Sequence, residues 1–238
     1  MYTTSEMSSL HTPSRTQQVL GDQRRLNTLK AMALIDTPSE GVFDRLTRLA
    51  SHLVGTPVSL VALIDQDRAF FKSAFGLPPE MRQMPLTHSV CKHVVVGNQP
   101  LIVRDAREVD FLSVNAAVTD MGVVGYLGIP LMTSDGQTLG SFCVIDTVVR
   151  EWSENDIKIM EDLAETAMAL MEMRAQLFTQ NTQSETKLRG LMGQVVQADT
   201  KRKEAVAAHH QFVAHITQLV EAAAPTADIL AALKSEAK

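Results

Sequence analysis

The sequence has little of several features that would mark a specialised class of protein. Its 238 residues include only two cysteines, which excludes a disulfide framework and fits a reducing compartment. No apolar run approaches the ~18 residues that indicate a membrane helix. The first residues, rich in Ser and Thr, lack the apolar core of a secretory signal. We therefore expect a cytoplasmic protein that does not associate with membranes.

Positive charge is not in excess, and aromatic side chains are scarce. The chain has 22 Lys and Arg against 27 Asp and Glu, for a formal net charge of -5. General nucleic-acid binding needs an excess of cationic residues, so no nucleic-acid partner is expected. Aromatic residues make up 5% and hydrophobic residues 45% of the chain. Aliphatic side chains and the 12 methionines must therefore form most of a globular core.

Recognisable enzyme and metal motifs are also missing. The sequence has no Walker-type glycine loop, no Gly-x-Ser-x-Gly elbow and no His-Glu-x-x-His. His88 and His93 lie five residues apart and His52 belongs to another predicted helix, so no ligand quartet has zinc spacing. We predict no catalytic residue, no metal site and no enzyme activity. A single histidine can bind haem, so a haem sensor stays open as an alternative.

Composition divides the chain into three segments. Residues 1–19 are predicted to be disordered, residues 20–178 to form a folded domain, and residues 179–238 to form a helical tail. In the domain, Leu26, Leu29, Ala33 and Leu34 recur at helical spacing and predict a first helix that ends before Asp36.

A second helix is expected directly afterwards. Thr37 can cap it, Pro38 suits the first helical position, and Glu40 stands where a capping box needs a carboxylate. Gly55 ends this helix, because glycine readily adopts the left-handed C-cap conformation. The predicted apolar stripe is Phe43, Leu46, Ala50 and Leu53.

The middle of the domain is predicted to form a sheet. Short apolar runs bounded by Gly, Pro, Asn and Asp predict strands at residues 57–64, 68–75, 101–103, 126–132 and 138–145. The prolines in residues 76–85 predict an irregular loop, and short helical segments are expected after Thr87 or Ser89 and within residues 106–124. The turn Ser134-Asp-Gly136 suits a hairpin.

A long helix is expected to close the domain. Ser153 can cap it with Asp156 at the capping-box position. Its predicted buried stripe is Ile157, Met160, Leu163, Ala164, Ala167, Leu170, Met171, Arg174 and Phe178. Strands gathered between flanking helices indicate an α+β fold with a mainly antiparallel sheet.

Several strings in this order resemble the motifs of bacterial GAF domains. They are Leu34-Ile-Asp-Thr-Pro38, Phe43-Asp-Arg-Leu46, Val61-Ala-Leu-Ile-Asp65, Ser89-Val-Cys-Lys-His93, Gly128-Ile-Pro-Leu131 and Leu139-Gly-Ser-Phe-Cys-Val-Ile-Asp146. The resemblance implies a GAF-like antiparallel sheet flanked by helices and a role in signal transduction. Because GAF domains differ widely in what they bind, the resemblance assigns no cofactor.

The resemblance also implies where a small ligand would bind, between the sheet and the segment from Phe70 to Tyr126. The candidate lining residues are Phe71, Arg82, Cys91, His93, Asp105, Phe111 and Tyr126. Among these, Phe71 and Tyr126 are the preferred wall residues.

Cys91 and His93 suggest two alternative chemistries. Photoreceptor GAF domains carry a bilin-binding Cys followed directly by His, whereas here Lys92 intervenes. Two residues apart on a helix point about 200° from each other, so these side chains should not share a face. A thiol-based redox GAF protein would need two cysteines, and only Cys143 could partner Cys91. Since Cys143 lies in an apolar strand that disfavours a thiolate, core packing is the preferred interpretation of both.

The tail is predicted to be a long helix with a thin apolar seam. Its apolar residues at near-heptad positions are Leu188, Met192, Val195, Val206, Val213, Ile216 and Val220. Such a helix buries little alone and gains from pairing as a coiled coil. Pro225 should break it, and a short helix is expected over residues 226–234.

These observations favour a bacterial sensory module that binds a small ligand, dimerises, or does both. The tail has no room for a kinase, cyclase or helix-turn-helix domain, so the effector should be a separate protein contacted through the tail. One alternative is a purely structural GAF dimer with a filled pocket. A second is a thiol-based redox sensor or a bilin or haem sensor.

Overall fold

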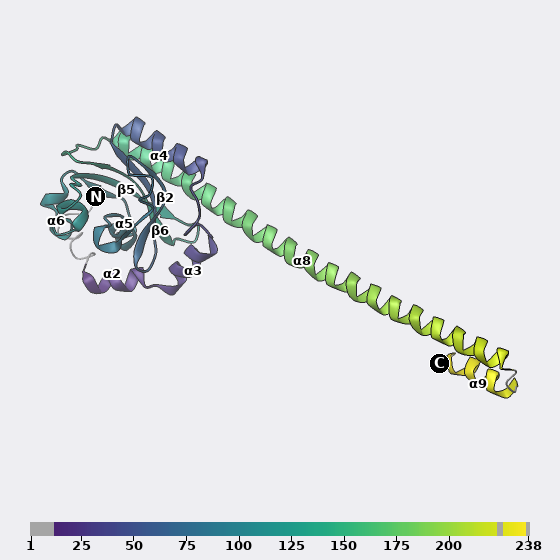
Figure 1. Ribbon diagram of the computed structural model, residues 1–238. Helices are drawn as coiled ribbons and strands as arrows, with labels where there is room; N and C mark the ends of the chain where they lie inside the picture. The colour runs from purple at the N-terminus through teal and green to yellow at the C-terminus, as the bar shows by residue number, and fades with distance from the viewer. Residues whose placement is uncertain (1–11, 223–225, 237–238) are drawn as a thin grey trace. The chain divides into compact units, whose positions relative to one another are not determined.

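The computed structural model describes residues 12–222 and 226–236 (Figure 1). The chain divides into two compact units, one ending at Phe178 and the other beginning at Thr179. The first unit contains the sheet and the helices that pack on it. The second contains the helical tail.

The first unit is built on a six-stranded antiparallel sheet with the order β3-β2-β1-β6-β5-β4. The strands are β1 (Val58–Ile64), β2 (Arg68–Phe75), β3 (Gln83–Pro85), β4 (Leu101–Val103), β5 (Gly125–Met132) and β6 (Thr138–Asp146). The predicted α+β class and the five predicted strands are confirmed.

Strand β3 corrects the prediction that residues 76–85 form only an irregular loop. Phe70 of β2 pairs with Gln83, and Arg68 pairs with Pro85. A proline is tolerated here because β3 is an edge strand and Pro85 is its last residue.

The amino-terminal part of the unit contains two short helices. In α2 (Pro13–Leu20) the side chain of Thr12 accepts a hydrogen bond from the Arg15 amide, and in α3 (Gln23–Ala31) Asp22 caps in the same way. The predicted disorder of residues 1–19 is therefore wrong for residues 13–19, because a capped helix forms there; residues 1–11 lie outside the described residues. Helix α3 ends before Asp36, as predicted.

Helix α4 (Gly41–Val54) begins later than its predicted capping motif. Its N-cap residue is Glu40, whose side chain makes no capping hydrogen bond. The Thr37 hydroxyl instead donates to the Leu34 carbonyl oxygen at 2.6 Å. The predicted stripe is correct except at Leu53, which is 58% exposed while Val54 is buried. Gly55 ends the helix at φ 71°, as predicted.

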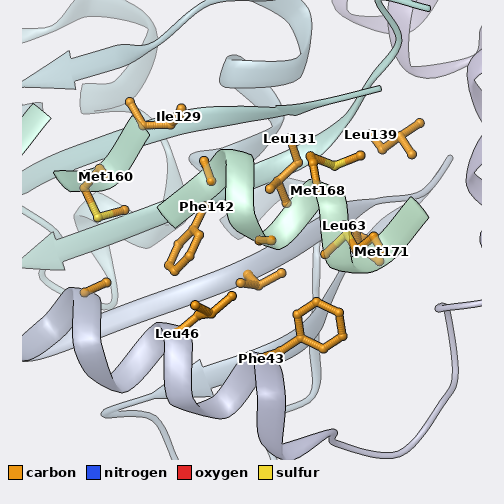
Figure 2. Packing of buried hydrophobic residues seen from close by; sticks show 14 of the residues in the cluster. Phe43, Leu46, Leu63, Ile129, Leu131, Leu139, Phe142, Met160, Met168 and Met171 are labelled. Carbon is orange, nitrogen blue, oxygen red and sulfur yellow. The ribbon is translucent and has the colours of Figure 1, made fainter. Parts of the chain in front are cut away.

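Helices α4 and α8 (Glu154–Glu221) bury their apolar sides against one face of the sheet (Figure 2). The Ser153–Asp156 capping box is present: the Ser153 hydroxyl accepts from the Asp156 amide, and the Asp156 carboxylate accepts from the Ser153 amide. The buried residues of α8 are Met160, Ala164, Ala167, Met168 and Met171. Phe178, predicted to be the last of this stripe, is 53% exposed.

Shorter helices cover the opposite face of the sheet and form a second apolar cluster. They are η1 (Leu86–His88), α5 (Cys91–Gly97), η2 (Ala106–Glu108), α6 (Asp110–Ser113) and α7 (Ala116–Thr119). The two faces alternate along each strand. On β5, Tyr126 belongs to the α5 side and Leu127 to the α8 side, and on β6 Cys143 and Val144 do the same.

In the second unit, α8 continues without interruption through the polar residues 179–187 to Glu221. The predicted terminal helix is present as α9 (Thr226–Glu236), while Pro225, the predicted helix breaker, lies outside the described residues. Large apolar side chains stay exposed along this part of α8, including Leu188 at 59% and Val195 at 68%. Among residues 12–222 and 226–236, no helix has the length and apolarity to cross a bilayer.

Candidate functional site

A cavity of about 90 Å³ lies between the sheet and the segments that cover its α5 side. Five strands, β1, β2, β3, β5 and β6, contribute side chains that belong to the second apolar cluster. The lining residues are Val58, Leu60, Phe71, Leu77, Met84, His88, Ser89, Val90, Cys91, Ala117, Met121, Val123, Tyr126, Ile145 and Thr147. The wall is therefore almost entirely apolar.

Three of the seven predicted site residues line this cavity: Phe71, Cys91 and Tyr126. Phe71 and Tyr126, the preferred wall residues, project from β2 and β5 and are buried. The Tyr126 hydroxyl lies 3.3 Å from the hydroxyl of Ser141. Burial raises the pKa of Tyr126 well above its usual value, so this phenol stays neutral.

The other four predicted residues lie outside the cavity lining. Arg82 donates to the Thr37 carbonyl oxygen at 3.1 Å and lines a separate, polar pocket of about 210 Å³. His93 packs against Phe111 with ring centroids 4.9 Å apart. Cys91 thus faces the cavity while His93 faces elsewhere, in line with their predicted divergence.

Asp105 has a structural partner of its own. Its carboxylate accepts two hydrogen bonds from the Arg107 guanidinium, at 2.8 and 2.6 Å. These contacts lower the pKa of Asp105 to about 2. The carboxylate also caps η2 through the Arg107 amide, so it stabilises a turn.

Sequence reasoning missed most of the cavity wall. Leu77, Ala117, Met121 and Val123 come from loops and a short helix, where no periodic pattern predicts which side chain points inward. Met84 comes from β3, which was not predicted as a strand. None of these side chains has a charged or reactive group that would mark it as a site residue. Ile145 could have been found, because alternation along β6 places it on the same face as Cys143.

The two cysteines meet beside the cavity. The Sγ atoms of Cys91 on α5 and Cys143 on β6 lie 3.6 Å apart, and both residues are buried. Their predicted burial in the core is confirmed. The hydrogen bond with Cys143 lowers the pKa of Cys91, whereas burial raises the pKa of Cys143 well above its usual range.

The volume limits what the cavity holds. Pockets for drug-sized ligands measure roughly 300–1,000 Å³, and an engineered cavity of about 150 Å³ takes benzene. At about 90 Å³, this cavity is smaller than either of these. Among the described residues there is no group of three His, Cys, Asp or Glu placed to hold a metal ion.

These features define the class of protein: an α+β domain with one open antiparallel sheet and a small apolar pocket beneath its covering helices. The chain belongs to the GAF domain family, whose match spans residues 38–171. It is a signalling GAF module followed by a helical tail.

One relative of known activity matches part of the chain. The chain is 31% identical over 140 residues to a cyclic di-GMP phosphodiesterase of Pseudomonas aeruginosa, a match that covers 58% of this chain and 24% of the relative. The matched region thus spans only about a quarter of that relative's length.

The fold is also that of a solved GAF domain. The GAF domain of a Coxiella burnetii phosphoenolpyruvate-protein phosphotransferase has a TM-score of 0.50 at 15% identity, covering 64% of this chain and 94% of that one. The corresponding domain from Acinetobacter has a TM-score of 0.49 at 16% identity, covering 66% of this chain and 99% of that one.

Proposed function

We propose that the chain is a non-catalytic sensory module in which a small apolar molecule in the cavity alters the packing of the sheet on α8. Helix α8 passes this change to a separate partner protein. The proposal rests on the observation that β5 and β6 contact the cavity with one face and the cluster that contains α8 with the other. Tyr126 and Ile145 line the cavity, while their neighbours Leu127 and Val144 pack in the cluster that contains α8.

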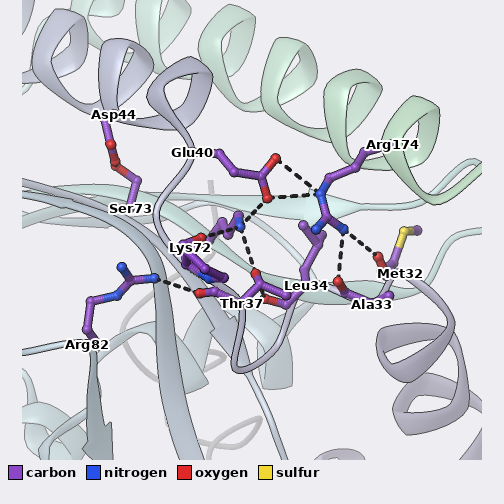
Figure 3. A network of polar contacts seen from close by, with 11 residues as sticks. Met32, Ala33, Leu34, Thr37, Glu40, Asp44, Lys72, Ser73, Arg82 and Arg174 are labelled. Carbon is purple, nitrogen blue, oxygen red and sulfur yellow. Dashed lines mark hydrogen bonds and ion pairs between the residues drawn. The ribbon is translucent and has the colours of Figure 1, made fainter. Parts of the chain in front are cut away.

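A polar network gives the sheet a second connection to α8 (Figure 3). Phe71 of β2 lines the cavity, and the next residue, Lys72, is fully buried on the opposite face. Lys72 pairs with Glu40, which also accepts from Arg174 of α8 at 2.9 Å. Arg174 donates to the Ala33 carbonyl oxygen at 2.8 Å. A displacement of β2 would therefore change the contacts of the last turns of α8 in this unit.

We propose further that the tail pairs with a second copy of the chain. In α8, one stripe of positions is separated alternately by four and three residues, which is the heptad spacing of a coiled coil. Its members are Leu188, Met192, Val195, Asp199, Arg202, Val206, His209, Val213, Ile216 and Val220. Most of its apolar members are about half exposed or more, and a second copy would cover them.

The charges in this stripe favour an antiparallel pair. In a parallel, in-register pair Asp199 would face Asp199 and Arg202 would face Arg202, so like charges would repel at both positions. In an antiparallel pair centred between these residues, Asp199 faces Arg202 of the second copy. The same register sets Val195 against Val206 and Leu188 against Val213.

A purely structural GAF dimer is the second candidate. The observation that favours it is the small volume of the cavity, about 90 Å³, because apolar side chains already fill most of the space. In that case the domain would hold the tails in place and respond to no ligand.

Xenon is a suitable probe of the sensory proposal, since it enters small apolar cavities. With the methionine methyl groups of the full chain carbon-13 labelled, we expect xenon to shift the NMR signals of Met84 and Met121, which line the cavity. We also expect smaller shifts at Met160 and Met171, which pack on the far side of the sheet. These second shifts would report the change that α8 receives.

Filling the cavity supplies the control. Ala117 is buried in the wall, so Ala117→Leu should abolish all of these shifts. Val114→Leu, at a site that is 81% exposed, should leave them intact. Shifts confined to Met84 and Met121 would contradict the relay through the sheet. No shift at any methionine would contradict a ligand cavity and leave the structural dimer.

A further inference from the structure

The cysteine pair is arranged as a reactive site rather than as simple core packing. The chain has only two cysteines, 52 residues apart in sequence, yet their sulfur atoms lie 3.6 Å apart. One comes from a helix that covers the sheet and the other from a central strand.

Access to the two sulfurs is unequal. Cys91 lines the cavity and keeps 4% of its surface exposed, whereas Cys143 is fully buried. A cavity needs roughly 10–15 Å³ to hold one water molecule. The cavity of about 90 Å³ therefore admits a molecule of a few heavy atoms to Cys91.

The electrostatic environment points the same way. Hydrogen bonds from Cys143 and Tyr126 stabilise a thiolate at Cys91 and lower its pKa. Burial keeps Cys143 protonated. Redox-responsive cysteines combine a lowered pKa with access and a neighbouring resolving thiol. Cys91 has the lowered pKa and the neighbouring thiol, and the cavity that it lines gives a small molecule access to it.

We propose that Cys91 is oxidised by a small hydroperoxide that enters the cavity, and that Cys143 resolves the product as an intramolecular disulfide. The Cys91 thiolate attacks one peroxide oxygen and the O–O bond breaks. Hydrogen peroxide thereby loses hydroxide, which takes up a proton and leaves as water, and Cys91 becomes a sulfenic acid. The Cys143 sulfur then attacks the Cys91 sulfur, the S–O bond breaks, and the departing hydroxide leaves as water with the Cys143 proton.

The balance is complete: two thiols and one hydrogen peroxide give one disulfide and two waters. The sulfurs must approach from 3.6 Å to a disulfide bond length of about 2.05 Å. The disulfide would join α5 directly to β6. The next residues along β6 on its other face, Phe142 and Val144, belong to the cluster that contains α8.

This inference does not depend on the cavity also serving a reversible ligand. It predicts selectivity by size, because the disulfide of glutathione is far larger than the cavity. We therefore expect hydrogen peroxide to oxidise the pair at neutral pH and glutathione disulfide to leave it reduced over the same time. The measurement is intact mass after thiol alkylation, in which the disulfide form takes up no label and has lost the mass of two hydrogens.

Single variants assign the roles. In Cys143→Ser, Cys91 should accumulate as a sulfenic acid that dimedone traps. In Cys91→Ser, Cys143 should react with peroxide at least about tenfold more slowly than Cys91 does in the first variant, because its thiol is more deeply buried and its pKa is raised. Far-UV circular dichroism checks that both variants fold.

Two outcomes would overturn the proposal. One is a wild-type chain that keeps two labelled thiols after peroxide treatment. The other is equal peroxide reactivity of Cys91 and Cys143 in the folded single variants, which would mean that the cavity gives neither thiol preferred access. A disulfide that dithiothreitol reverses, formed by peroxide and not by glutathione disulfide, supports it.

Discussion

Replacing Glu40 with glutamine is expected to lower the free energy of unfolding of the first unit by about 2–3 kcal/mol. The Lys72 ammonium is fully buried, and Glu40 carries the carboxylate that pairs with it. Breaking a fully buried pair by removing one charge costs about 3–5 kcal/mol. The expected cost is lower here because the Glu40 side chain is 33% exposed. Urea unfolding followed by the fluorescence of Trp152, the single tryptophan, measures it.

Two further variants test the reason for this loss. Adding Lys72→Met to Glu40→Gln should recover most of the stability, because no uncompensated charge then stays buried. Glu151→Gln removes a carboxylate of the same size from a surface pair in which Arg104 is 59% and Glu151 79% exposed. Exposed pairs contribute about 0–1 kcal/mol. Equal losses from the two Glu→Gln changes would show that the burial of Lys72 is unimportant.

The same network shows where local sequence signals mislead. Thr37, Pro38 and Glu40 have the composition of a capping box, yet α4 starts at Gly41. Their polar atoms instead accept hydrogen bonds from Lys72: Nζ donates to the Thr37 hydroxyl at 2.8 Å and to the Pro38 carbonyl oxygen at 2.9 Å. A partner 35 residues away cannot be read from a four-residue motif. Ser153 and Asp156 instead bond to each other, as their motif predicts.

Strands were predicted more accurately than the cavity for a related reason. The limits of β1 and β2 are encoded locally, by Pro57 before one and the turn at Asp65 between them. The cavity depends on side-chain directions in irregular segments, which tertiary contacts decide. Arg82 points away from the cavity because it donates to the Thr37 carbonyl oxygen and packs on Phe70. Its guanidinium carbon lies 5.6 Å from the centre of the Phe70 ring.

The sequence named Cys91 and Cys143 as the one possible thiol pair but did not predict that they would meet. Strand alternation indicates which face of the sheet Cys143 occupies. It does not indicate that α5 crosses that face with its first residue over β6. Only the packing of α5 on β6 brings Cys91 within 3.6 Å of Cys143, and this distance is what favours redox chemistry over simple core packing.

Reversing one charge in the tail is expected to weaken the proposed dimer at least about 100-fold. In the antiparallel register, Asp199→Arg converts two contacts between Asp199 and Arg202 into two contacts between guanidinium groups. Like charges set against each other cost several kcal/mol, and about 2.8 kcal/mol already corresponds to 100-fold in Kd. Sedimentation velocity of the full chain over a range of concentrations measures this change.

The exchange of both charges makes the test specific for strand direction. Asp199→Arg combined with Arg202→Asp restores opposite charges in the antiparallel pair, so dimerisation should return to near the wild-type Kd. In a parallel pair the single change would only replace repulsion between two carboxylates with repulsion between two guanidinium groups, and neither the loss nor the rescue would occur. Glu204→Arg makes the same change of charge on the outer side of the helix and should leave Kd within about threefold. A monomeric wild-type chain, or equal effects of the changes at Asp199 and Glu204, would show that the stripe does not pair with a second copy; far-UV circular dichroism separates this result from loss of the helix.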